Sequence, residues 1–170
     1  STWNKRCGIA SYSKNLLSFF SDFYFVLASS NKDISFKDES HVHRVWKEDI
    51  SETQDYTNLE NIIFKECLNT VVIQFNFGFF NLNRFSEFLA HLKAKSVSII
   101  IILHSIKSPE NIESLSLSSF FKSLKLCDRI LVHSLKDINF LKNIGLVDNV
   151  TIFPHGIIDN NKLNYKKRLF

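Results

Sequence analysis

The hydrophobic pattern of this chain is dominated by short, uninterrupted apolar runs, and the clearest of them covers residues 97–105. The run reads Val-Ser-Ile-Ile-Ile-Ile-Leu-His-Ser. Its length and its β-branched residues fit a strand, and it is too short for a membrane span. Because apolar and polar residues do not alternate in it, we expect a strand that is buried on both faces, as in a parallel sheet covered by helices.

Three further runs have the same character, and each of the four leads into polar side chains. The strands and the residues that follow them are 71–75 before Asn76, 97–103 before His104, 129–132 before His133 and Ser134, and 150–153 before Pro154, His155 and Gly156. One polar ending is ordinary, because any chain becomes polar where it leaves a sheet. In open α/β sheets, however, ligands bind beyond the carboxyl ends of the strands. Four such endings together predict one edge of a ligand site.

Helical spacing of apolar residues predicts the elements between these strands. Helices are expected near residues 9–20, 55–68, 83–94, 112–126 and 135–144, and two more strands at 23–28 and 41–46. Asn81 and Asn83 are both suitable N-caps for the third helix, and Gly145 is expected to end the last one.

Strands that alternate with helices indicate βαβ units, so the predicted fold class is α/β: a Rossmann-like open parallel sheet with helices on both faces. Residues 1–8 form a predicted loop that leads straight into a helix, although a strand normally precedes such a loop. The first strand therefore either lies upstream in a longer parent or has been removed. Its loss would leave a gap in the sheet.

Composition fits one globular domain. The chain has 170 residues, of which 45% are hydrophobic, and its seventeen phenylalanines predict a well-filled core. We assign residues 1–158 to the domain and residues 159–170, which lack a core pattern, to a basic tail. The net charge of +4 allows contact with a phosphate-bearing ligand or an anionic surface, but lacks the dense basic stripe typical of nucleic-acid binding.

The cysteines bear on the compartment. Cys7, Cys67 and Cys127 are an odd number with no short spacing, which disfavours a disulfide framework or a zinc site. A reducing compartment, and hence a cytoplasmic location, is expected. No apolar run approaches the roughly 20 residues that a membrane span requires.

Each candidate site residue has a functional and a structural interpretation. Gly8 lies in a loop at a helix N-terminus, where an anion is favoured, but a lone glycine is also an ordinary turn residue. His104 suits hydrogen bonding to a sugar or phosphate, or acid–base catalysis, and equally a packed core histidine. For His133 the structural interpretation is favoured, with Ser134 as a helix N-cap. His155 suits a hinge as well as a ligand.

Two further patterns bear on the candidate chemistry. His41 and His43 share a strand face at a spacing that suits a metal, but no third ligand is evident, so no metal is assigned. No Ser-His-Asp order or activated cysteine stands out. The residues alone therefore predict an α/β domain with a polar ligand site at the strand ends.

Five segments, in order along the chain, extend this interpretation. They are residues 3–12 (WNKRCGIASY), 74–80 (QFNFGFF), 103–105 (LHS), 127–134 (CDRILVHS) and 150–156 (VTIFPHG). Together they resemble the N-terminal half of nucleotide-sugar glycosyltransferases of family 4, which have the GT-B fold. One departure is that the His-Glu pair of that family is Phe75-Asn76 here, and Asn76 cannot carry charge.

The resemblance implies the acceptor-side domain of a retaining hexosyltransferase of polysaccharide biosynthesis, inactive without a C-terminal donor-binding domain that follows the basic tail. The donor is a nucleotide sugar, the acceptor is a glycan or a lipid-linked sugar, and no cofactor or metal is required. The implied roles are donor phosphate binding by Cys7, Gly8 and Ile9, catalysis by His104, acceptor or sugar binding by Asn76, Gly78, His133 and Ser134, and a hinge at His155 and Gly156.

Three interpretations stay open at this stage. The first is the glycosyltransferase domain, with peripheral contact at the inner face of a membrane as one route to a lipid-linked acceptor. The second is a non-catalytic module that binds a glycan or a protein, which the uncharged Asn76 would suit. The third is an unrelated single-domain α/β protein that binds a small phosphorylated ligand. Nucleic acid is not an expected partner.

Overall fold

The computed structural model describes residues 2–30, 36–107 and 117–156, with the backbone alone at 117–119. Helices and strands alternate along it, which confirms the α/β class. The elements are α1 (Gly8–Leu17), β1 (Val26–Ser29), β2 (Val42–Trp46), α2 (Thr57–Lys65), β3 (Thr70–Phe75), the short 3₁₀ helix η1 (Phe77–Phe79), α3 (Leu82–Ala94), β4 (Ser98–Leu103), α4 (Leu117–Leu124), β5 (Arg129–Val132), α5 (Leu135–Asn143) and β6 (Val150–Ile152).

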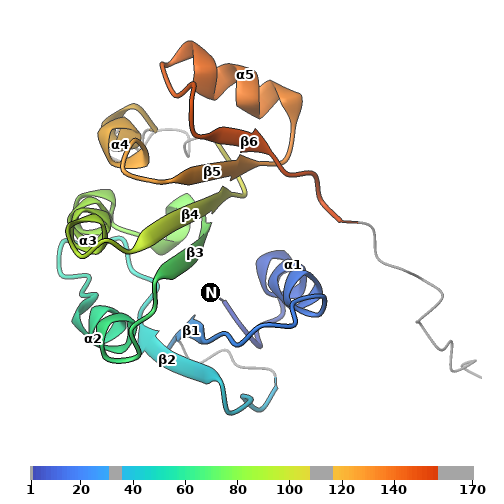
Figure 1. Cartoon of the computed structure of the whole chain (residues 1–170), viewed down its shortest axis with the longest axis vertical. Coiled ribbons are helices and arrows are strands. Elements are labelled where there is room, and N and C mark those ends of the chain that lie inside the picture. Colours follow the sequence, from blue (N-terminus) through green and yellow to red (C-terminus); the bar gives the residue numbers. More distant parts are fainter. Residues whose placement is uncertain (1, 31–35, 108–116, 157–170) are drawn as a thin grey trace, which may run out of the picture.

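The strands form two parallel sheets. β1 pairs with β2, and a second sheet has the order β3-β4-β5-β6. In Figure 1 the β1–β2 sheet lies below β3, the first strand of the larger sheet. Among the described strands, no ladder joins the two sheets.

Burial of the strands depends on their place in the sheet. β4 lies inside the larger sheet, and Ile99, Ile101 and Ile102 are fully or almost fully buried in it, as predicted. The prediction that all four strands are buried on both faces is wrong for β3 and β6, since Val72 is 51% exposed and Ile152 is 37% exposed. These two strands lie at the edges of the sheet, where one neighbour is absent among the described residues.

Two layers of helices flank the strands. In Figure 1, α2, α3 and α4 lie along one side and α1 along the other. The core between the larger sheet and α3 is built on phenylalanine: the Phe75 ring is stacked with Phe80, Phe85 and Phe120 at centroid distances of 5.6, 5.8 and 5.4 Å. The phenylalanine-rich composition thus fills this core.

Local signals set most element ends. The side-chain oxygen Oδ1 of Asn81 accepts a hydrogen bond from the Arg84 N–H at 3.0 Å, which selects Asn81 as the cap of α3. Gly145 has a φ of +93° just after α5, as a helix-ending glycine should.

Two elements differ from their expected bounds. α1 stops at Leu17 rather than near residue 20, and β1 begins at Val26 rather than residue 23. Residues 112–116 of the predicted fourth helix and the whole predicted tail (159–170) lie outside the described residues.

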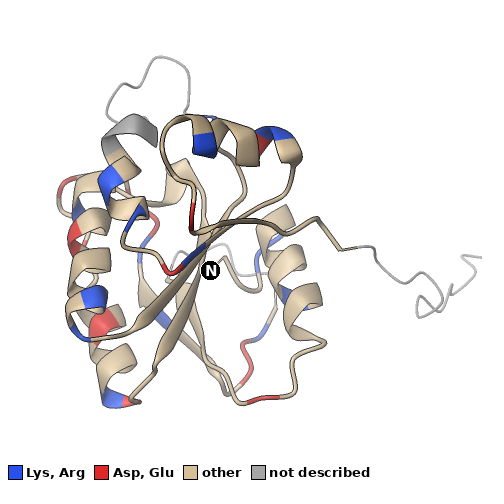
Figure 2. Cartoon of the chain, turned by 45° about the horizontal axis from the view of Figure 1, so that its top comes forward, with Lys and Arg blue, Asp and Glu red and all other residues tan. Residues whose placement is uncertain are grey.

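Charged residues follow the same layering. In Figure 2, Lys, Arg, Asp and Glu lie mainly on helices and loops, and the strand ribbons are largely free of them. Among the described residues, no helix has the length and apolar character needed to cross a membrane.

Candidate functional site

Three histidines meet at the carboxyl edge of the larger sheet. His104 follows β4, His133 follows β5, and His155 comes shortly after β6. The parallel register pairs Leu103 with Val132 and Val132 with Ile152, so the strand ends are level. The rings of His133 and His155 are stacked with centroids 3.7 Å apart, and His104 lies 5.2 Å from His133. The convergence expected from the strand endings is confirmed for these three residues.

Tyr12 of α1 completes this group, and the four residues are here called the histidine cluster. Its ring meets His104 edge-on at a centroid distance of 5.1 Å, and His133 and His155 at 5.5 Å each. The Tyr12 hydroxyl is buried and has no hydrogen-bond partner among the described residues. Burial raises the pKa of Tyr12, so the phenol keeps its proton and remains a donor.

His104 is neutral in this setting. Burial, assisted by the neighbouring His133 and His155, lowers its pKa to about 4. Its Nε2 lies 2.6 Å from Oε1 of Gln74. Because that oxygen is an acceptor, Nε2 carries the proton and Nδ1 of the neutral ring is an acceptor. A ligand hydroxyl would therefore donate to His104 Nδ1.

His133 holds the opposite tautomer. Its Nδ1–H donates to the carbonyl oxygen of Phe153 at 2.8 Å, so Nε2 is the acceptor. Burial lowers the pKa of His133, and Nε2 is a buried atom without a hydrogen-bond partner in the described part of the chain. Buried polar atoms in native proteins are nearly always paired. The cluster thus contains a donor, Tyr12 Oη, and an acceptor, His133 Nε2, that the described protein leaves unmatched.

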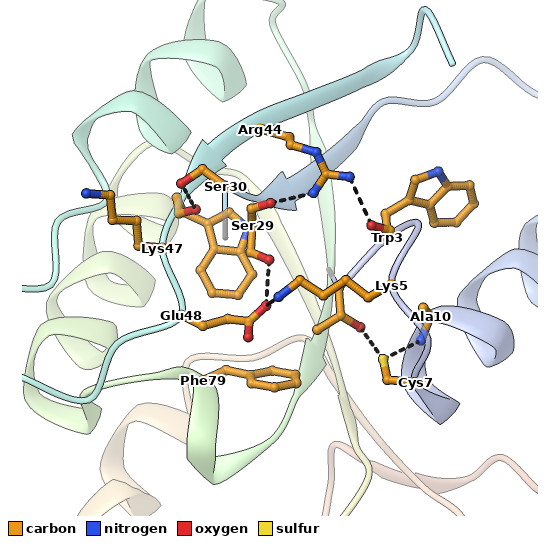
Figure 3. Close-up of polar contacts among 12 residues, drawn as sticks. Trp3, Lys5, Cys7, Ala10, Ser29, Ser30, Arg44, Lys47, Glu48 and Phe79 are labelled. Carbon is orange, nitrogen blue, oxygen red and sulfur yellow. Dashed lines mark hydrogen bonds and ion pairs between the residues drawn. The ribbon is translucent and has the colours of Figure 1, made fainter. Parts of the chain in front are cut away.

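The loop before α1 is held by side chains from the β1–β2 sheet (Figure 3). Lys5 Nζ lies 2.6 Å from Glu48 Oε1, and the Ser29 hydroxyl donates to the same oxygen. Lys5 and Arg6 are the two cationic residues just before the Gly8 loop, and this pairing neutralises Lys5. Lys5 and Glu48 lie far apart along the chain, so no local sequence pattern predicts this pair.

The Gly8 loop is partly occupied by its own cap. Cys7 is the N-cap of α1, where its Sγ accepts from the Ala10 N–H at 3.4 Å and contacts the Thr2 hydroxyl at 2.9 Å (Figure 3). Gly8 is exposed, and a Cβ added there would meet nothing within 4 Å. The first turn of α1, including Ile9, is therefore open to a ligand on the Gly8 side. Phosphate binding there remains a prediction.

The remaining predicted site residues lie in local turns. The side-chain oxygen Oδ1 of Asn76 accepts from the Gly78 N–H at 3.0 Å and so caps η1. Ser134 caps α5, bonding the backbone N–H of Asp137 and donating to its carboxylate, which is the structural role favoured for it. Gly156 is exposed beside His155. None of their recorded bonds connects them to the histidine cluster.

Sequence reasoning overlooked two members of the site, Tyr12 and Gln74. Tyr12 belongs to the apolar stripe of the first predicted helix, and Gln74 is the lone polar residue inside a predicted strand. A polar side chain in an otherwise apolar strand was the signal available for Gln74.

The described residues contain no group of three or more His, Cys, Asp or Glu side chains placed to hold a metal. His41 and His43 instead pack against Tyr24 and Phe25, at centroid distances of 5.1 and 5.2 Å. Comparisons with protein-family models, curated proteins and solved structures found no match for this chain.

Proposed function

We propose that this chain is the N-terminal, acceptor-side domain of a retaining glycosyltransferase that transfers a hexose from a nucleotide sugar to a glycan or lipid-linked acceptor. The observation that carries the proposal is the histidine cluster. A sugar hydroxyl both donates and accepts hydrogen bonds, and the cluster offers the Tyr12 O–H as donor with His104 Nδ1 and His133 Nε2 as acceptors. All three groups are uncharged at neutral pH, which suits a neutral sugar.

His104 would orient the transferring sugar. A hydroxyl that donates to Nδ1 is fixed relative to the sheet, because Gln74 holds the opposite side of the ring at 2.6 Å. Positioning of this kind lowers the barrier by removing rotational freedom before the reaction. In the transfer, the bond from the anomeric carbon to the diphosphate breaks, and a bond to the acceptor oxygen forms. The hydroxyl proton leaves with the diphosphate or to solvent.

The open first turn of α1 supports the diphosphate side of the proposal. Helix N-termini favour negative charge through free N–H groups and the helix dipole. Gly8 leaves that approach unobstructed. A donor-binding domain following the tail would supply most nucleotide contacts. The free thiols of Cys7, Cys67 and Cys127 are typical of a reducing compartment, which supports a cytoplasmic location.

A second candidate is a non-catalytic module that binds glycan or protein. Asn76 favours it, since this side chain is uncharged and its amide oxygen Oδ1 already caps η1. Such a module would bind sugar hydroxyls through the same donor and acceptor atoms of the histidine cluster, but would transfer no sugar.

The test uses the full native polypeptide and measures release of nucleoside diphosphate from a panel of nucleotide sugars. We expect His104→Ala to lower turnover by about 100-fold, as loss of a positioning contact does, with a melting temperature close to that of the native protein. His91→Ala is the matched control, because His91 is an exposed histidine of α3 outside the cluster.

Unchanged turnover in His104→Ala would overturn the catalytic role. If the native protein releases no nucleoside diphosphate but binds a glycan in a manner that His104→Ala abolishes, the binding-module interpretation replaces the enzyme.

A further inference from the structure

Two neighbouring strands of the larger sheet hold Gln74 and His104 side by side. β3 and β4 pair Gln74 with Ile102. The backbone N–H of His104 then donates to the carbonyl oxygen of Phe75 at 3.3 Å, so the ladder extends to the histidine. Residues two apart on a strand face the same side, which places His104 on the same face of the sheet as Ile102 and Gln74. The paired backbones therefore set the distance between the amide and the imidazole.

The side-chain amide of Gln74 is held at one point. Its recorded hydrogen bond in the described part of the chain joins Oε1 to His104 Nε2 at 2.6 Å. Gln74 also lines an apolar groove of about 640 Å³. The two sheets both contribute to this groove, β1 through Val26 and Leu27 and β3 through residues 70–74. Among the described residues, His104 is thus the recorded partner that orients the amide.

Two hydrogen-bonded arrangements of this pair are related by a half-turn of the amide. In the structure Oε1 accepts from Nε2–H of His104, and Nδ1 of the ring is an acceptor. After a half-turn the amide NH₂ group donates to Nε2, the ring proton exchanges through water from Nε2 to Nδ1, and Nδ1 becomes a donor. The torsion that relates the two is broad and roughly two-fold in glutamine. The ring is neutral in both arrangements, in agreement with the lowered pKa of His104.

We propose that Gln74 is a positioning residue that lets His104 Nδ1 bind either kind of ligand oxygen: a hydroxyl that donates a hydrogen bond, or an oxygen that carries no hydrogen, such as an ether or carbonyl oxygen. The inference concerns the site of the proposed function. It does not require that the ligand be a sugar or that it be transferred.

His133 provides a contrast within the same site. Its Nδ1–H donates to the backbone carbonyl oxygen of Phe153 at 2.8 Å. A backbone carbonyl has no donor to offer, so no rotation of the partner reverses this bond, and Nε2 of His133 is an acceptor toward every ligand. The rings of His104 and His133 are 5.2 Å apart. A ligand oxygen beside His133 must therefore carry a hydrogen, whereas one beside His104 need not.

Nitrogen NMR on the full native polypeptide tests the inference, because long-range proton–nitrogen correlations show which ring nitrogen carries the proton. The measurement is made at about pH 8.5, above the ordinary imidazole pKa. We expect His104 to be mainly the Nε2–H form with about 10% of the Nδ1–H form, and His133 to be the Nδ1–H form alone. Dimethyl sulfoxide, a neutral probe that only accepts hydrogen bonds, should raise the Nδ1–H fraction of His104 at least about twofold and leave His133 unchanged.

A pair of variants assigns the effect to the amide. Gln74→Glu keeps an acceptor oxygen and removes the NH₂ donor, so it should hold His104 in the Nε2–H form and abolish the response to dimethyl sulfoxide. Val72→Glu is the matched control for the added charge. Val72 lies two residues earlier on β3 and is 51% exposed, so this variant should keep both forms and the response.

Two results would each overturn the proposal. The first is a His104 ring in a single form in the native polypeptide, with and without dimethyl sulfoxide, and this measurement stands even where a variant fails to fold. The second is a response that persists in Gln74→Glu, since the amide would then not be its cause. Sugar transfer is not measured in either experiment, so failure of the proposed function leaves both results unaffected.

Discussion

At the scale of single residues, His104 and His133 differ in tautomer because their partners differ. Gln74 Oε1 fixes the proton of His104 on Nε2, whereas the Phe153 carbonyl fixes that of His133 on Nδ1. Two adjacent imidazoles thereby present different nitrogens to the carboxyl edge of the sheet. Burial keeps both rings neutral, since it lowers the pKa of each.

This arrangement predicts a pH dependence of stability. The pKa of His104 is about 4 in the folded chain, against an ordinary value of 6.5. Between these values the unfolded chain binds more protons, so the free energy of unfolding falls as pH is lowered. The contribution of His104 is complete above pH 6.5, declines from pH 6.5 to about 4, and is lost below that.

Urea titrations from pH 4.5 to 7.5 on the native chain and His104→Gln measure this effect. The variant should show a shallower decline, with the residual slope due in part to His133. Carboxylates with lowered pKa values, such as Asp38 and Asp128, act below this range. Parallel curves would show that His104 does not titrate differently on folding.

At the scale of elements, the ends of α3 and α5 reach the same left-handed backbone with different residues. Gly145 follows α5 with a φ of +93°, and Ser96 follows α3 with a φ of +59°. A residue with a Cβ is strained in this region, whereas glycine adopts it readily. The helix that ends on serine is therefore the less well terminated of the two.

Opposite substitutions should have opposite effects. Ser96→Gly is expected to raise the free energy of unfolding by about 0.5–1 kcal/mol. Gly145→Ala is expected to lower it by about 1 kcal/mol or more, because its new Cβ would also lie 3.4 Å from Cζ of Phe121. Urea midpoints measure both, and a shift of the same sign in the two variants would contradict the backbone argument.

At the scale of the whole molecule, stacked phenylalanines connect strands to helices. Phe75 is fully buried at the end of β3 and contacts rings from the loop after η1, from α3 and from α4. Removal of such a ring costs both its transfer free energy and the cavity left behind.

We expect Phe75→Ala to lower the free energy of unfolding by about 3–5 kcal/mol. Phe36→Ala is the control: Phe36 is 60% exposed and its recorded ring contact is with Lys14, so about 1 kcal/mol or less is expected. Chemical denaturation measures both. An equal decrease in the free energy of unfolding in the two variants would show that the aromatic stack does not stabilise the core.

Several features of the candidate site were predictable because they depend on local rules. His104, His133 and His155 follow apolar strands, and parallel strands end at a common edge, so their convergence follows from the pattern. Tyr12 could not be assigned in this way, because a tyrosine in a helical apolar stripe has the same pattern whether it faces core or ligand. The Lys5–Glu48 pair likewise depends on two segments meeting in space.

The amino-acid sequence by itself determined the α/β class, the alternation of elements, the caps at Ser134 and Gly145, and the polar strand endings. These features depend on periodicity and on backbone preferences within a few residues. The tertiary structure alone decided which strands became edges, which nitrogens of the histidines are free, and that β1 and β3 face one groove. Those features depend on strand order and on contacts between distant segments, which no local pattern contains.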